Sequence, residues 1–223
     1  MKTIVEVYDA DNRRPEIMEQ AGEILKSGGL VAFPTETVYG LGGDALNPEA
    51  SAKIYAAKGR PSDNPLIVHI ADMEALKVLA SEVPEKARLL ADRFWPGPLT
   101  MIMPKSDAVP YATTGGLDTV AIRMPSHPTA YELIRSSGVY IAAPSANTSG
   151  RPSPTTAQHV YEDLNGRIDM IIDSGKVDIG LESTIVDLTG EIPTILRPGY
   201  ITKEMLEEAV GPVTIDKAIL ADH

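Results

Sequence analysis

Short apolar runs alternate with amphipathic segments along almost the whole chain, and this alternation most limits the folds that it can adopt. The runs LVAF (30–33), LIVHI (66–70) and VYIAAP (139–144) have the length of buried strands. Between such runs, the segment 15–27 places its apolar residues on one helical face. Helices that alternate with buried strands predict an α/β protein with one layered core.

Capping residues and glycines predict where the other elements begin and end. Asn47 followed by Pro48 is typical of a helix start, and Gly59 of its end. The same signals predict helices that begin near residues 72, 84, 128, 156 and 202, and strands at 3–10, 98–104, 119–124, 168–173, 183–188 and 194–198. Several polar loops start where these strands end, and ligands tend to bind at such positions in α/β sheets.

The segment GLGGDA (40–45) fits the spacing of a dinucleotide-binding loop but lacks its context. That loop joins a strand directly to a helix, whereas here Pro34 interrupts the preceding strand and the next helix starts only at Pro48. We therefore predict a glycine turn at this place. No phosphate-binding loop of the G-x-x-x-x-G-K-[ST] type occurs either.

Composition excludes several classes of site. The chain has no cysteine, which rules out disulfides, thiolate nucleophiles and Cys-ligated metals. No two of its four histidines are spaced i, i+4, and no Ser-His-Asp order appears. The net charge of −11 and only eleven aromatic residues argue against a nucleic-acid clamp. Without a membrane-length apolar run or a signal-peptide pattern, we expect a soluble cytoplasmic protein that contacts no membrane.

Three polar loops carry the side chains most suited to chemistry. KGRPSDN (58–64) combines two cations, a hydroxyl and an amide, which together suit a polyphosphate, although a solvated helix end would look similar. PSANTSGRPSPT (144–155) is rich in hydroxyls and could cradle phosphate or be an ordinary turn. FPTETVYG (33–40) is the third loop. Cations and hydroxyls without an obvious base suit nucleotidyl transfer, which works by positioning and charge neutralisation.

Seven stretches together resemble the YrdC-like L-threonylcarbamoyladenylate synthases, in the family's order. They are FPTETVYGLGGDA, KGRPSDNPLIVHI, FWPGPLTMIM, VAIRMPSHP, APSANTSGRPSPT, GLESTIVDL and ILRPGYIT, between Phe33 and Thr202. The resemblance implies a twisted mixed β-sheet flanked by helices, with a large, locally positive concave cavity. It also implies a reaction in which L-threonine, bicarbonate or CO2, and ATP give threonylcarbamoyl-AMP and pyrophosphate. A separate transferase machinery would then modify the adenosine next to the anticodon of ANN-decoding tRNAs.

The same resemblance implies roles for individual residues. By motif, the threonine site comprises Thr35, His69, Arg123, Ala143 and Ser183. The ATP site comprises Lys58, Arg60, Ser62, Thr119, Ser145, Ser153 and Arg197, with Asn64 and Asn147 as weaker candidates. Lys58 and Arg60 would act catalytically by offsetting charge on the attacked phosphate and on the leaving pyrophosphate. Magnesium would accompany ATP, and no protein ligand for the metal is assigned.

The resemblance also bears on domain organisation. Residues 1–200 match the synthase domain, and 201–223 read as a C-terminal helix and the start of a linker that longer members continue into a second domain. Two alternatives stay open. One is an RNA-binding module, which could also appear as weak RNA binding by the synthase. The other is a related carbamoyl-adenylate enzyme that does not use threonine.

Overall fold

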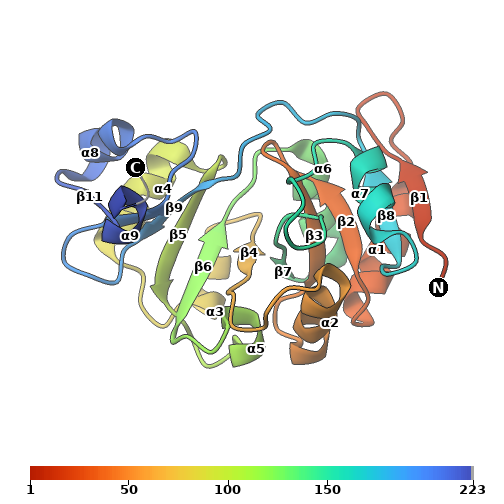
Figure 1. Cartoon of the computed structure of the whole chain (residues 1–223), viewed down its shortest axis with the longest axis horizontal. Coiled ribbons are helices and arrows are strands. Elements are labelled where there is room, and N and C mark those ends of the chain that lie inside the picture. The colour runs from red at the N-terminus through yellow and green to blue at the C-terminus, as the bar shows by residue number, and fades with distance from the viewer. Residues whose placement is uncertain (222–223) are drawn as a thin grey trace.

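The computed structural model describes residues 1–221, and within them one mixed sheet of eleven strands runs from one end of the molecule to the other (Figure 1). Residues 222 and 223, the end of the segment expected to begin a linker, lie outside this description. The strand order is β1-β8-β2-β3-β7-β4-β6-β5-β9-β10-β11. The bounds are β1 (Ile4–Val7), β2 (Val31–Pro34), β3 (Tyr39–Asp44), β4 (Ile67–His69), β5 (Leu99–Pro104), β6 (Thr119–Arg123), β7 (Ile141–Ala142), β8 (Met170–Asp173), β9 (Thr184–Asp187), β10 (Thr194–Arg197) and β11 (Thr214–Ile215).

Nine helices accompany the sheet in the described part of the chain. They are α1 (Pro15–Lys26), α2 (Pro48–Lys58), α3 (Ala75–Leu79), α4 (Glu85–Phe94), α5 (Tyr111–Thr114), α6 (Pro128–Ser137), α7 (Ala157–Leu164), α8 (Lys203–Val210) and α9 (Lys217–Ala221). Parallel pairs such as β4–β6 occur beside antiparallel pairs such as β5–β6. The α/β class and the mixed sheet flanked by helices are therefore confirmed.

Helices cover both faces of the sheet, and the alternation of side chains along β2 shows how. Val31 and Phe33 point into a cluster shared with α1 and α6, whereas Ala32 points into the larger cluster that α2 and α7 join. Successive side chains of a strand point to opposite faces, so a fully apolar strand such as β2 can serve two cores. The alternation of the sequence thus produces layers of helix, sheet and helix.

The glycine turn predicted at 40–45 is wrong, because most of this segment forms β3. Its glycines are required by close packing rather than by a turn. A Cβ on Gly42 would lie 2.7 Å from Ile141 Cγ2 and 2.9 Å from Phe33 Cε1. Only glycine leaves room for these neighbours. The rejection of a dinucleotide-binding loop stands, since β3 does not lead directly into a helix.

The helix predicted after Asn47 forms as α2, and it ends at the loop that contains the segment KGRPSDN (58–64). The Asn47 side chain accepts hydrogen bonds from the backbone N–H groups of Glu49 and Ala50, and Gly59 ends the helix in the left-handed conformation, with φ of 66°. Lys58, the last residue of α2, is therefore fixed in place. No helix among residues 1–221 is both long enough and apolar enough to cross a membrane.

Candidate functional site

A cavity of about 240 Å³ lies where β4, β6, β9 and β10 meet the loops after β2, α2 and β7. All five side chains or backbones expected to hold threonine line it, and so do three of the residues expected to hold ATP. These eight are Thr35, His69, Arg123, Ala143, Ser183, Arg60, Ser145 and Arg197. Segments from 35 to 197 in the sequence thus converge on one place.

Strand register sets the centre of the cavity. β4 and β6 run parallel, and their pairing places His69 directly beside Arg123. Arg123 is only 3% exposed, and its guanidinium is held on three sides. Its Nε donates to Gly97 O (3.3 Å), one terminal nitrogen donates to Thr37 Oγ1 (3.1 Å), and the other forms an ion pair with Glu36. Such fixed geometry favours recognition of a planar carboxylate.

His69 contributes a neutral ring to this centre. Complete burial lowers its pKa to about 3, and the nearby charge of Arg123 acts in the same direction. The Nδ1 atom lies 3.1 Å from Ile67 O, and the ring meets Phe33 edge to face at 5.9 Å between centroids. At neutral pH the imidazole therefore adds polarity without adding a second positive charge.

Two hydroxyl groups complete this part of the cavity. Thr35 Oγ1 donates to Val38 O (2.7 Å) and lies 2.9 Å from Thr37 Oγ1. Ser183 Oγ lies 2.8 Å from Thr100 Oγ1 and accepts a hydrogen bond from Arg197 at 3.1 Å. Both hydroxyls are held by the protein itself, so they are preorganised rather than free to rotate.

Lys58 lies beside the cavity, behind Ser145. It is only 4% exposed, so the alternative of a solvated helix end does not hold for this residue, although residues 61–64 of the same loop are exposed. Its Nζ donates to Ser145 O and lies 3.5 Å from Asn147 Oδ1. Burial, and then the charge of Arg60, lower the pKa of Lys58 to about 8. A buried ammonium held by carbonyl and amide oxygens is well placed to interact with an anion.

Arg60, on the loop after α2, and Arg197, the last residue of β10, both line this cavity. Arg60 donates to Pro65 O (3.1 Å), while its buried Nε has no hydrogen-bond partner within residues 1–221. Arg197 donates to Ser183 O (2.9 Å) and to Glu182 Oε2 (3.0 Å). With Lys58 and Arg123 these make four cations, against the carboxylates of Glu36 and Glu182 and, near Lys58, that of Asp163. The site is thus locally positive in an acidic protein, as anion binding requires.

The remaining sequence-predicted residues lie outside the cavity lining, with the exception of Asn64. Ser62 is exposed on the loop after α2. Thr119 shares a face of β6 with Ala121 and Arg123 but lies beyond the lining. Ser153 does not line the cavity, yet its Oγ donates to Glu182 (3.1 Å), which does. Asn64 lines the cavity, whereas Asn147 is buried behind it, donating to Thr148 O and Arg151 O.

Sequence reasoning gave no role to two acidic residues that the structure places in the site. Glu36 pairs with Arg123 and accepts two hydrogen bonds from Ser126, at 2.9 and 2.8 Å. Glu182 lies between Arg197 and Ser153. Both belong to the quoted motifs FPTET and GLEST, but a single carboxylate in a motif does not reveal its partner. The partners here come from segments 87 and 15 residues away.

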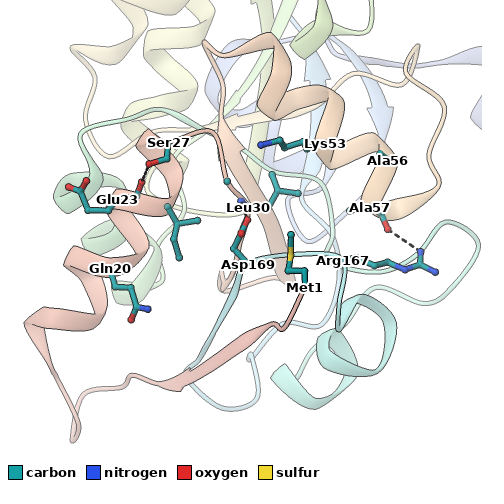
Figure 2. A pocket seen from close by; sticks show the side chains of 12 residues that line it. Met1, Gln20, Glu23, Ser27, Leu30, Lys53, Ala56, Ala57, Arg167 and Asp169 are labelled. Carbon is teal, nitrogen blue, oxygen red and sulfur yellow. Dashed lines mark hydrogen bonds between the residues drawn. The ribbon is translucent and has the colours of Figure 1, made fainter.

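A larger hollow of about 1000 Å³ lies elsewhere, between α1, α2 and the segment that precedes β8 (Figure 2). Three of its polar side chains are already engaged within the protein. Lys53 donates to Gly28 O, Arg167 donates to Ala57 O, and Asp169 accepts from the backbone N–H of Leu30. It lacks the convergence of charged and hydroxyl groups that marks the smaller cavity, which is therefore the better candidate site.

The described residues offer no ready-made metal site. Among residues 1–221, no three side chains of His, Cys, Asp or Glu are grouped so as to hold a metal ion. The carboxylate that lines the cavity, Glu182, has one oxygen on Arg197 and the other on Ser153.

Comparison with known proteins identifies the family of this chain. The family model Sua5_yciO_yrdC, described as "Telomere recombination", matches residues 23–199. The threonylcarbamoyl-AMP synthase of Bacillus subtilis is 56% identical over 98% of this chain and 64% of its own length. That of Pseudomonas putida is 35% identical over 82% of this chain and 97% of its own.

A solved structure provides a further comparison. The crystal structure of Pyrococcus abyssi Sua5 complexed with L-threonine has a TM-score of 0.93 and 52% identity, over 99% of this chain and 64% of that one. The chain thus spans less than two thirds of the length of the Bacillus and Pyrococcus proteins. With the family model matched over most of the sequence and the fold shared, the chain belongs to the Sua5/YciO/YrdC family.

Proposed function

We propose that this chain is an L-threonylcarbamoyladenylate synthase, which converts L-threonine, bicarbonate or CO2, and ATP into threonylcarbamoyl-AMP and pyrophosphate. One observation carries the proposal: a cavity in which a fixed guanidinium and a neutral imidazole, Arg123 and His69, adjoin the cations Lys58, Arg60 and Arg197. This arrangement suits an amino acid held next to a polyphosphate. The names of the Bacillus and Pseudomonas relatives support it.

Threonine would bind through its carboxylate at Arg123. The guanidinium uses three N–H groups on Gly97, Thr37 and Glu36 and retains two of its five for a ligand. Neutral His69 would not repel the amino group of the substrate. The lining also contains apolar side chains, such as Val38 and Ala121, against which the threonine methyl can pack. That contact favours threonine over serine by only about 1–3 kcal/mol, so serine should be a poor substrate rather than an excluded one.

The chemistry would require positioning rather than a covalent intermediate. The neutral amine of threonine adds to CO2 and releases one proton to solvent, which gives a carbamate. A carbamate oxygen then attacks the α-phosphorus of ATP. The bond to the β-phosphate oxygen breaks, and pyrophosphate leaves with the negative charge. Lys58 and Arg60 would neutralise charge that develops on the phosphates, which is the main contribution a protein makes to such transfers. Magnesium would come as part of the ATP substrate.

We further propose the roles of the remaining groups and of the product. Ser145, Ser153 and Arg197 would contact the nucleotide, with Ser62 and Thr119 reaching it from the rim. The product would pass to a tRNA-modifying transferase that acts beside the anticodon. Residues 1–200 would form the synthase unit, and residues 201–223 would form a C-terminal helix and the start of a linker, of which α8 packs on the main core and β11 extends the sheet.

Pyrophosphate release tests this proposal. With ATP and magnesium present, we expect release only when both threonine and bicarbonate are added. Omitting either is the matched control. Release that needs neither, or ATP turnover with no dependence on threonine, would contradict the proposal. Calorimetry with serine in place of threonine then distinguishes a related enzyme of other specificity, and salt-dependent RNA binding without turnover would favour an RNA-binding module.

A further inference from the structure

Glu182 occupies an unusual place for an acidic residue. It is the one carboxylate among the described residues that line the cavity. Its Oε2 accepts from Arg197 at 3.0 Å, and its Oε1 accepts from Ser153 Oγ at 3.1 Å. Two residues that the proposed function assigns to the nucleotide are thus both engaged by one side chain of the protein.

The electrostatic influence of Glu182 extends to the whole cation cluster. Its negative charge favours the protonated form of Lys58, Arg60 and Arg197, although burial lowers the pKa of each. Without an anion, three buried or half-buried cations close together would repel one another. The Glu182 carboxylate is thus the anion that offsets this repulsion within the cavity lining.

We infer that Glu182 is the built-in counter-ion of the phosphate subsite, and that the phosphates of the nucleotide displace it from Arg197 and Ser153. The inference rests on the proposed function for its ligand, ATP. Displacement is structurally feasible because the Glu182 side chain is 35% exposed and can turn towards solvent. When no nucleotide is bound, the carboxylate stabilises the protein and holds the cationic side chains in place. Because it competes with the phosphates for these side chains, it lowers the affinity for the nucleotide.

The substitution Glu182→Gln separates charge from hydrogen bonding. The Gln oxygen can still accept from Arg197, so the orientation of the guanidinium is retained while the competing charge is removed. By calorimetry in EDTA, we expect the variant to bind ATP more tightly than the wild type, by roughly tenfold. The matched control is Glu208→Gln, which removes the same charge from an exposed Arg–Glu pair, with Arg93, and should leave ATP affinity unchanged.

A second measurement follows stability rather than affinity. Without ligand, Glu182→Gln should melt at a lower temperature than the wild type, and inorganic phosphate should raise its melting temperature more than that of the wild type. If the variant does not fold, Glu182→Ala replaces it and is expected to change affinity in the same direction.

The direction in which Glu182→Gln changes the affinity for ATP distinguishes the possible roles of Glu182. Weaker or unchanged ATP binding in EDTA would overturn the inference and leave Glu182 as an orienting residue only. Weaker binding of magnesium-ATP by the variant would overturn it too, and would make the carboxylate a metal ligand. Absence of ATP binding by the wild type would refute the proposed function itself, together with the inference.

Discussion

Removal of the Arg123 guanidinium should destabilise the fold as well as abolish threonine binding. The side chains of Arg123 and Glu36 are 4% and 11% exposed. Arg123→Met therefore leaves a buried carboxylate that keeps, from other residues among 1–221, only the two hydrogen bonds of Ser126. Breaking a buried ion pair in this way costs about 3–5 kcal/mol. For a domain of this size, each kcal/mol lowers the melting temperature by about 2–4 °C, so we expect a decrease of roughly 6–20 °C.

The double variant Glu36→Gln with Arg123→Met is the control for this prediction. It buries no uncompensated charge, so it should recover much of the stability that the single variant loses, while threonine binding stays lost. Thermal melts followed by far-UV circular dichroism measure the first quantity, and calorimetry with threonine measures the second. A single variant that is as stable as the double variant would refute the reasoning.

The ion pair between Glu36 and Arg123 also predicts how the stability lost in Arg123→Met depends on pH. Burial opposes ionisation of Glu36, but Arg123 and the hydrogen bonds from Ser126 outweigh it and lower its pKa. The pair therefore stabilises the wild type above the unfolded pKa of about 4.3, and this contribution is lost as the pH falls through the folded pKa. In Arg123→Met, burial dominates and the carboxyl protonates at a higher pH. The difference in unfolding free energy between the wild type and Arg123→Met should therefore narrow as the pH is lowered. A constant difference would contradict the assignment of the loss to the ionised Glu36 carboxylate.

Three further predictions concern other residues. Lys58→Ala should lower turnover far more than it weakens threonine binding, as measured by kcat against the calorimetric Kd; equal losses would contradict a role at the phosphates. Because the pKa of Lys58 is about 8 in the unliganded protein, the cation is lost above that pH. The kcat/KM for ATP of the wild type should therefore fall at alkaline pH relative to that of Lys58→Arg, whose charge persists; parallel pH profiles would exclude this cause. In urea melts, Gly42→Ala should lower the unfolding free energy by about 1–3 kcal/mol, because the added Cβ would lie 2.7 Å from Ile141 Cγ2. The control Gly190→Ala should be nearly neutral, because the nearest contact of its Cβ is at 3.8 Å.

The fold could be predicted wherever local signals are strong. Asn47, Pro48 and Gly59 define α2 because capping and left-handed backbone are local properties. β3 was missed because its glycines resemble a turn, and the reason for them, the closeness of Ile141 and Phe33, exists only after the strands pair. The two-residue strand β11 was missed too, since its place is set by pairing with β10 rather than by its own sequence.

The site likewise has one part that could be predicted from the sequence and one part that could not. Its cations and hydroxyls were identified from motifs, and the pairing of β4 with β6 brings His69 and Arg123 together as the resemblance requires. The partners of those cations were not visible. Glu36 and Glu182 acquire their roles through contacts across the fold, and the sequence contains no signal for which cation each will meet. The charge balance of the cavity is therefore a property of the tertiary structure.

The most direct test of the central claim is to follow the carbon of bicarbonate. The protein is incubated with 13C-bicarbonate, L-threonine, ATP and magnesium, and the products are analysed by mass spectrometry. We predict one labelled product that contains threonine, the bicarbonate carbon and AMP, formed in equal amount to pyrophosphate. A threonine–AMP product without the label, or ATP consumption that yields no threonine-containing adduct, would contradict the account.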